Sequence, residues 1–173
     1  RISADSGLGV APGSTTADHL TINGGTLTST ADFTLNSNRG VALGSSHGTF
    51  RVNGSTTLTV AGIVSGSNNL IKSASGTLIL SGVNTYSGTT TINGGTLNIS
   101  GQLGSGSYSN TISNSDTFEI SSSSNQTISG AISNSGNLVK SGSGTLTLSA
   151  TNTFTGTTTI NGGVVSISAE AGL

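Results

Sequence analysis

Apolar residues alternate with small polar residues in short runs along most of the chain. Typical runs are Phe33-Thr-Leu35, Leu97-Asn-Ile99, Phe118-Glu-Ile120 and Leu146-Thr-Leu148. A period of two is the pattern of a β-strand that turns alternate side chains toward a core. Apolar residues at helical spacing are absent, and glycine recurs every few residues, which disfavours helices. The pattern predicts an all-β protein built from many short strands.

A unit of 31 residues occurs twice, at 70–100 and at 138–168, with 21 of 31 positions identical and a constant offset of 68 residues. A partial copy lies within residues 1–28, where Leu20-Thr-Ile-Asn-Gly-Gly-Thr-Leu27 repeats the centre of the unit. Self-similarity at a fixed period is typical of stacked repeat architectures. In addition, Ile167–Leu173 resembles Ile2–Leu8, 165 residues earlier.

Short strands separated by Asn-Gly-Gly and Ser-Gly-rich turns are compatible with antiparallel hairpins or with a parallel β-solenoid. The fixed offset favours the solenoid, because stacking then places equivalent residues above one another. We expect three coils of about 22 to 23 residues in each 68-residue period. The prediction is a single β-solenoid over residues 1–173, with about seven to eight coils.

The glycine-rich segments Asn93-Gly94-Gly95 and Asn161-Gly162-Gly163 are predicted to be corners, because asparagine and glycine tolerate the positive φ of a tight turn. Asparagines at such corners could also stack in ladders. Tyr86 and Phe154 occupy equivalent repeat positions and are expected to fill the core or a corner. A platform that stacks against sugars is the alternative.

The repeat also gives expectations for inside and outside positions. Leu146 and Ile160 are predicted to be buried between coils, and Thr158 to be exposed. Lys72 and Lys140 are equivalent by repeat and are expected to be solvated beside a glycine-rich turn.

The segments Lys-Ser-Gly-Ser-Gly-Thr-Leu-Thr-Leu (140–148) and Asn-Thr-Phe-Thr-Gly-Thr-Thr-Thr-Ile-Asn-Gly-Gly (152–163), with their copy at 72–95, resemble the autotransporter-associated β-strand repeat. Residues 8–18 are similar to a segment that often precedes such a repeat. This repeat occurs in passenger regions of bacterial autotransporters and in very long secreted surface proteins. The resemblance implies a right-handed parallel β-helix that is extracellular or displayed at the cell surface, and it brings no catalytic residues.

Composition narrows the function further. Five basic and six acidic residues give a net charge of −1 without clusters, which argues against nucleic acid as a partner. No apolar run is long enough for a transmembrane helix. Cysteine, methionine and tryptophan are absent, and only 3% of residues are aromatic, so the core is not that of an ordinary globular domain.

Catalytic and metal-binding patterns are also missing, so we expect no enzyme activity, no cofactor and no metal site. The closest carboxylates, Asp116 and Glu119, are predicted to face opposite sides of a strand and make no acid–base pair. His19 and His47 lack the spacing of a zinc site or a triad and are expected at the surface. The calcium-binding nonapeptide of other solenoids does not occur. The six carboxylates are Asp5, Asp18, Asp32, Asp116, Glu119 and Glu170.

The leading hypothesis is a non-catalytic structural or adhesive protein of a surface or extracellular fibre. Alternatives are a glycan-binding or carbohydrate-active β-helix and, through the threonine triplets Thr89–Thr91 and Thr157–Thr159, an ice-binding solenoid. Neither terminus carries a recognisable polar cap, and the end of the chain resembles its beginning. We therefore expect end-to-end self-association into a filament or tandem array, with host-surface or matrix glycans as further partners.

Overall fold

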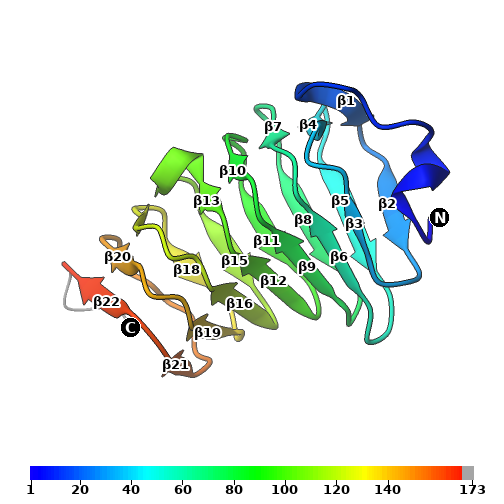
Figure 1. Ribbon diagram of the computed structural model, residues 1–173. Coiled ribbons are helices and arrows are strands. Elements are labelled where there is room, and N and C mark those ends of the chain that lie inside the picture. The colour runs from blue at the N-terminus through cyan, green and yellow to red at the C-terminus, as the bar shows by residue number, and fades with distance from the viewer. Residues whose placement is uncertain (169–173) are drawn as a thin grey trace.

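The chain winds into a parallel β-solenoid of about eight turns, as the sequence predicts. Figure 1 shows the turns stacked side by side from the N-terminal end to the C-terminal end in a computed structural model, which describes residues 1–168. The described residues form no α-helix. Two short 3-10 helices occur instead, η1 (Asp5–Leu8) and η2 (Gly104–Gly106). No helix in the described part has the length and hydrophobicity needed to cross a membrane.

Each turn contributes strands to three faces, because the chain changes direction at glycine-rich and polar corners. The first face is a six-stranded parallel sheet in the order β18-β15-β11-β8-β5-β2. Its strands are β2 (Thr26–Ser29), β5 (Gly48–Val52), β8 (Leu70–Ser73), β11 (Thr90–Ile92), β15 (Ile112–Asn114) and β18 (Ile132–Ser133).

The second face is a seven-stranded parallel sheet, β21-β19-β16-β12-β9-β6-β3. It comprises β3 (Phe33–Leu35), β6 (Thr57–Val60), β9 (Thr77–Leu80), β12 (Thr96–Ile99), β16 (Thr117–Ile120), β19 (Asn137–Lys140) and β21 (Thr158–Ile160).

The third face is divided into three parallel groups, β1-β4-β7, β10-β13 and β14-β17-β20-β22. The strands are β1 (Thr16–Ile22), β4 (Arg39–Leu43), β7 (Val64–Ser65), β10 (Val83–Asn84), β13 (Gln102–Leu103), β14 (Ser107–Tyr108), β17 (Gln126–Ile128), β20 (Thr145–Leu148) and β22 (Val164–Ile167). Side-chain amides bridge the breaks between these groups. Asn84 accepts a hydrogen bond from Val64 N (2.9 Å), and Gln126 accepts one from Leu103 N (2.8 Å).

The turns are shorter than the sequence led us to expect. Leu70 pairs with Thr90, 20 residues further on, and Leu97 pairs with Phe118, 21 residues further on. A 68-residue period therefore covers three turns and about one further face. Lys72 accordingly lies in β8 on the first face, whereas its equivalent Lys140 lies in β19 on the second. The expectation of three whole coils per period, with equivalent residues directly above one another, is wrong.

The core is a column of side chains contributed by alternate strand positions. In β9, β12, β16 and β20 the second and fourth residues are buried, as the period of two predicts. Leu146 is among them, and Tyr86 is buried while Phe154 is half-buried against the core. Predicted core positions in these strands and both predicted aromatic fillers are thereby confirmed.

Ile160 is a wrong prediction, because 53% of its surface is exposed. Its repeat equivalent Ile92 is fully buried, because β15 pairs with β11 on the far side. Strand β21 pairs with β19 alone among the described strands, so its inward side chain lacks a covering turn. Thr158 is half-buried rather than exposed.

The predicted corners are confirmed at the glycines. Gly95 and Gly163 both have φ of 67°, a left-handed conformation that favours glycine. Asn93 and Asn161 are exposed, and no hydrogen-bonded asparagine ladder joins them. The asparagines inside the described solenoid are instead Asn84, Asn114 and Asn152.

Candidate functional site

A buried arginine organises the N-terminal end of the solenoid. Arg39 is the first residue of β4, where alternation turns it inward with Val41 and Leu43. Only 1% of its surface is exposed. A buried guanidinium is costly unless each N–H donor finds an acceptor, so its partners decide what this end of the molecule looks like.

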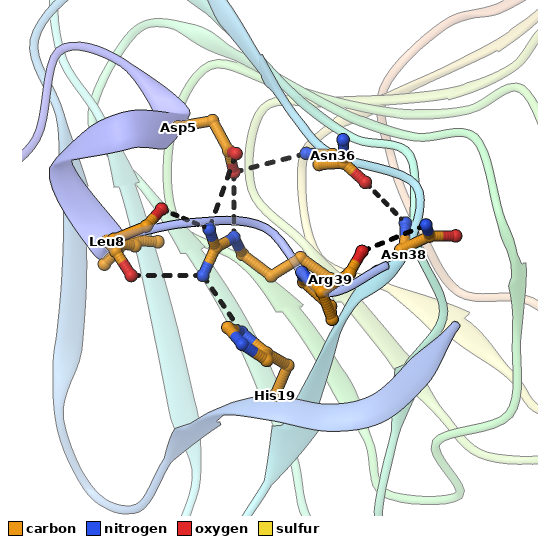
Figure 2. A network of polar contacts seen from close by, with 8 residues as sticks. Asp5, Leu8, His19, Asn36, Asn38 and Arg39 are labelled. Carbon is orange, nitrogen blue, oxygen red and sulfur yellow. Dashed lines mark hydrogen bonds and ion pairs between the residues drawn. The ribbon is translucent and has the colours of Figure 1, made fainter. Parts of the chain in front are cut away.

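All five N–H donors of Arg39 are satisfied, mostly by the N-terminal segment (Figure 2). Nε donates to Asp5 Oδ1 at 2.9 Å, and Nη2 faces Asp5 Oδ2 at 3.5 Å. The carbonyl oxygens of Leu8 and Gly9 accept from Nη1 at 3.2 Å and from Nη2 at 2.8 Å. We call Arg39 with Asp5, Leu8, Gly9 and His19 the Arg39 site.

His19 completes the Arg39 site from β1. Its Nδ1 lies 2.9 Å from Arg39 Nη1, and because a guanidinium only donates, Nδ1 is the acceptor and the ring proton is on Nε2. The imidazole is otherwise exposed, as predicted. His47 is also exposed and lies outside this network.

Further contacts bind residues 2–15 to the first turns. Ile2 forms a parallel bridge with Ser29, in which Ile2 N donates to Thr28 O (2.8 Å) and Thr30 N donates to Ile2 O (3.1 Å). The side chain of Asn38 donates to Pro12 O at 3.1 Å. The expectation of an N-terminal end without polar capping contacts is therefore wrong, because the buried Arg39 charge requires them.

The N-terminal segment leaves one part of this end uncovered. A hollow of about 380 Å³ is lined by Leu20, Thr21, Ile22, Asn23, Gly25, Thr26 and Leu27, at the corner between β1 and β2. Strand β2 is the outermost strand of the first face and has only the single Ile2 bridge on its free edge. The Arg39 site thus adjoins an open apolar corner and an unpaired strand edge.

The repeat lysines lie inside the solenoid, so their predicted solvation is wrong. Lys72 is fully buried, and its Nζ donates to the carbonyl oxygens of Ser73 (3.2 Å), Ala74 (2.7 Å) and Gly94 (2.9 Å). Burial lowers the pKa of Lys72 to about 8, and the Asp116 charge acts in the opposite direction. Lys140 donates to Gly142 O, and burial lowers its pKa as well. Each ammonium binds the carbonyl groups of a glycine-rich corner.

The carboxylates predicted to be unpaired as acid and base are engaged separately. Asp116 Oδ2 accepts from Gly95 N (2.7 Å) at a corner. Glu119 points outward from β16 and accepts from Asn98 Nδ2 (3.2 Å) and from the hydroxyl of Ser141 (2.5 Å). Within residues 1–168 no three histidine, cysteine or acidic side chains gather as a metal site would require.

The threonine triplets do not form one flat array. The central Thr90 is buried, and its hydroxyl joins the hydroxyls of Tyr86 (2.7 Å) and Tyr108 (2.8 Å). The two tyrosine rings meet edge to face at 5.7 Å between centroids. Thr89–Thr91 and Thr157–Thr159 also lie on different faces, because the repeat advances by one face.

Among curated proteins and among solved structures, nothing matches this chain. The family model described as Passenger-associated-transport-repeat matches two segments, residues 70–99 and 138–167. These are the segments in which the sequence resembles the autotransporter-associated repeat, and together they span about a third of the chain. The chain therefore carries two copies of the passenger-associated-transport-repeat, wound into a parallel β-solenoid.

Proposed function

We propose that this chain is a non-catalytic structural segment of a secreted or surface-displayed fibre or adhesin, and that copies of it associate end to end. The passenger-associated-transport-repeats and the β-solenoid fold support a surface or secreted β-helix protein. The outer faces support a passive role, because serine, threonine, asparagine and glycine dominate them.

The observation that carries the proposal is the state of the two ends. At one end the hollow beside β2 leaves Ile22 and Leu27 next to open space. At the other, Ile160, Val164 and Ile167 are about half exposed. Apolar surface and unpaired strand edges at opposite ends of a rod favour addition of further parallel strands. Joining unlike ends in this way gives filaments and not closed rings.

Association is tested by sedimentation and by electron microscopy of the purified chain over a wide concentration range. The proposal expects rods that lengthen with concentration while their width stays constant. Persistent monomers at the highest attainable concentration contradict it. A screen against bacterial and plant polysaccharides tests the non-catalytic part, and turnover lost in Asp116→Asn or Glu119→Gln would overturn it.

A second candidate function rests on the outer surface of the second face. Thr57, Thr77, Thr96 and Thr117 follow one another in register across β6, β9, β12 and β16. Neighbouring strands lie about 4.8 Å apart, so these hydroxyls form a regular row suited to a glycan or to ordered water. Retention on a glycan array, or thermal hysteresis in ice growth, would support this function. Substituting Thr77 and Thr96 with leucine should then abolish the signal.

A further inference from the structure

The sequence held by the Arg39 site occurs a second time in the chain. Ile2-Ser-Ala-Asp-Ser-Gly-Leu8 contacts β2 and Arg39, and Ile167-Ser-Ala-Glu-Ala-Gly-Leu173 repeats it with a carboxylate at the same place. Glu170 corresponds to Asp5, the residue that pairs with the Arg39 guanidinium at 2.9 Å. Ile167 and Leu173 correspond to Ile2 and Leu8, which pack against the core. The copy thus carries the side chains that the Arg39 site binds.

The strand that precedes this copy matches the uncovered part of β2. If Ile167 takes the place of Ile2 opposite Ser29, Ser166 falls opposite Thr28, Val165 opposite Leu27 and Val164 opposite Thr26. All four residues of β22 then pair with all four residues of β2. In the resident arrangement, Ile2 makes the bridge to β2 alone.

The direction of the side chains agrees with this register. Val165 and Ile167 pair with Leu146 and Leu148, which point into the core. On β2 the inward positions are Leu27 and Ser29. Val165 would therefore cover Leu27 beside the hollow, and the outward residues Val164 and Ser166 would remain outward. A shift by one residue would place polar side chains over the core.

We propose that the Arg39 site and β2 form the joint between successive copies of this chain. Val164–Leu173 of one copy lies parallel on β2 of the next and gives Glu170 to Arg39, in place of the resident Ile2–Leu8. The incoming segment makes the contacts that the resident one makes and adds the strand pairing over Thr26–Thr28. This joint deepens the proposed end-to-end association and rests on it.

Engineered cysteines test the register, and the chain has no cysteine of its own. Thr28→Cys in one sample and Ser166→Cys in another are mixed and mildly oxidised. Residues opposite each other on neighbouring strands are about 4.8 Å apart, within the Cα separation of about 4.4 to 6.8 Å that a disulfide spans. We expect a disulfide-linked heterodimer. The control pair, Thr26→Cys with Ser166→Cys, is two residues out of register and should remain uncrosslinked.

Two alanine variants test the exchange of carboxylates in the Thr28→Cys and Ser166→Cys mixture. Asp5→Ala in the receiving copy weakens the resident segment, so heterodimer yield should rise. Glu170→Ala in the incoming copy should lower the yield and leave its own fold, followed by circular dichroism, unchanged. A purely structural role for the Asp5 contact predicts no gain in yield from Asp5→Ala.

The possible results separate the joint from the association itself. Concentration-dependent rods without the in-register crosslink, or with equal crosslinking of the control pair, overturn the joint and leave end-to-end association standing. Monomers throughout, with neither crosslink, overturn both. The in-register crosslink together with opposite effects of the two alanine variants supports the joint.

Discussion

Buried cations are the main departure of individual residues from the sequence-based picture. Arg39, Lys72 and Lys140 are three of the five basic residues, and all are buried. Carbonyl oxygens and one carboxylate accept their hydrogen bonds. Alternation could have located them, because Lys72 shares its inward face with Leu70, Lys140 with Leu138, and Arg39 with Val41. The usual exposure of lysine and arginine hid this signal.

The lowered pKa of Lys72 predicts a pH-dependent stability. Between pH 8 and 10.5 the folded state binds fewer protons than the unfolded state, so the free energy of unfolding should rise with pH in this window. The rise is at most about 3 kcal/mol, since one pKa unit corresponds to about 1.4 kcal/mol. Urea denaturation at pH 7.5 to 10 measures it, and Lys72→Met should flatten the dependence.

The tyrosines set the upper limit of that window. Burial raises the pKa of Tyr108 to about 12 and that of Tyr86 well above its ordinary value of 10. Above pH 10 the unfolded state loses these protons first, so stability should fall again. A free energy of unfolding that falls steadily from pH 8 to 10 would contradict the burial of Lys72.

Two adjacent corner glycines form a matched pair for a second prediction. Gly95 has positive φ, and a methyl group there would overlap the carbonyl oxygen of Gly76. At Gly94 the methyl group would meet Ala74 O at 3.5 Å, an ordinary contact. Gly95→Ala should lower the free energy of unfolding by about 2 kcal/mol or more, and Gly94→Ala by less than about 0.5 kcal/mol. Similar denaturation midpoints for the two variants would show that this corner does not require glycine.

At the scale of strands and turns, position along the solenoid matters as much as side-chain pattern. Strand β11 has a neighbour on both sides, whereas β21 pairs only with β19 among the described strands. The same Thr-Thr-Ile sequence is therefore core in one copy of the repeat and partly exposed in the other. Period two predicts which side chains point inward, but it does not say whether the next turn covers them.

Ile92 and Ile160 give the third prediction. Ile92→Asp buries a carboxylate between turns and should cost more than about 4 kcal/mol, as should Leu146→Asp. Ile160→Asp leaves the carboxylate at an open end and should cost less than about 1 kcal/mol. Thermal and urea denaturation of the isolated chain measure both. An equally severe loss from Ile160→Asp would indicate that further chain or a second copy covers this end.

At the scale of the whole molecule, the sequence predicts the solenoid, its inward positions and its corners, because these follow from local alternation and glycine placement. The length of a turn is less accessible, since a 68-residue period divides into whole turns or into turns and a part equally well. The Arg39 site joins residues about 30 apart in the chain, and no local pattern in the sequence marks such a contact.

The distribution of charge predicts resistance to trypsin, which cleaves after lysine and arginine. Arg51 is exposed in β5, while Arg39, Lys72 and Lys140 are buried. Native protein should therefore survive digestion with cleavage after Arg51 alone in the chain interior. Urea-unfolded protein should be cut at every basic residue. Mass spectrometry of the fragments distinguishes the two, and rapid native cleavage after Lys72 or Lys140 would contradict their burial.

The advance of the repeat by about one face has a consequence for recognition. Successive copies present the same outer side chains in different directions, like the thread of a screw, and not as a stripe along one side. A flat partner, such as a membrane or another rod, would then meet equivalent groups only where the thread comes round to it again. A flexible partner able to wind around the rod would reach every copy, so this geometry selects partners by their ability to wrap.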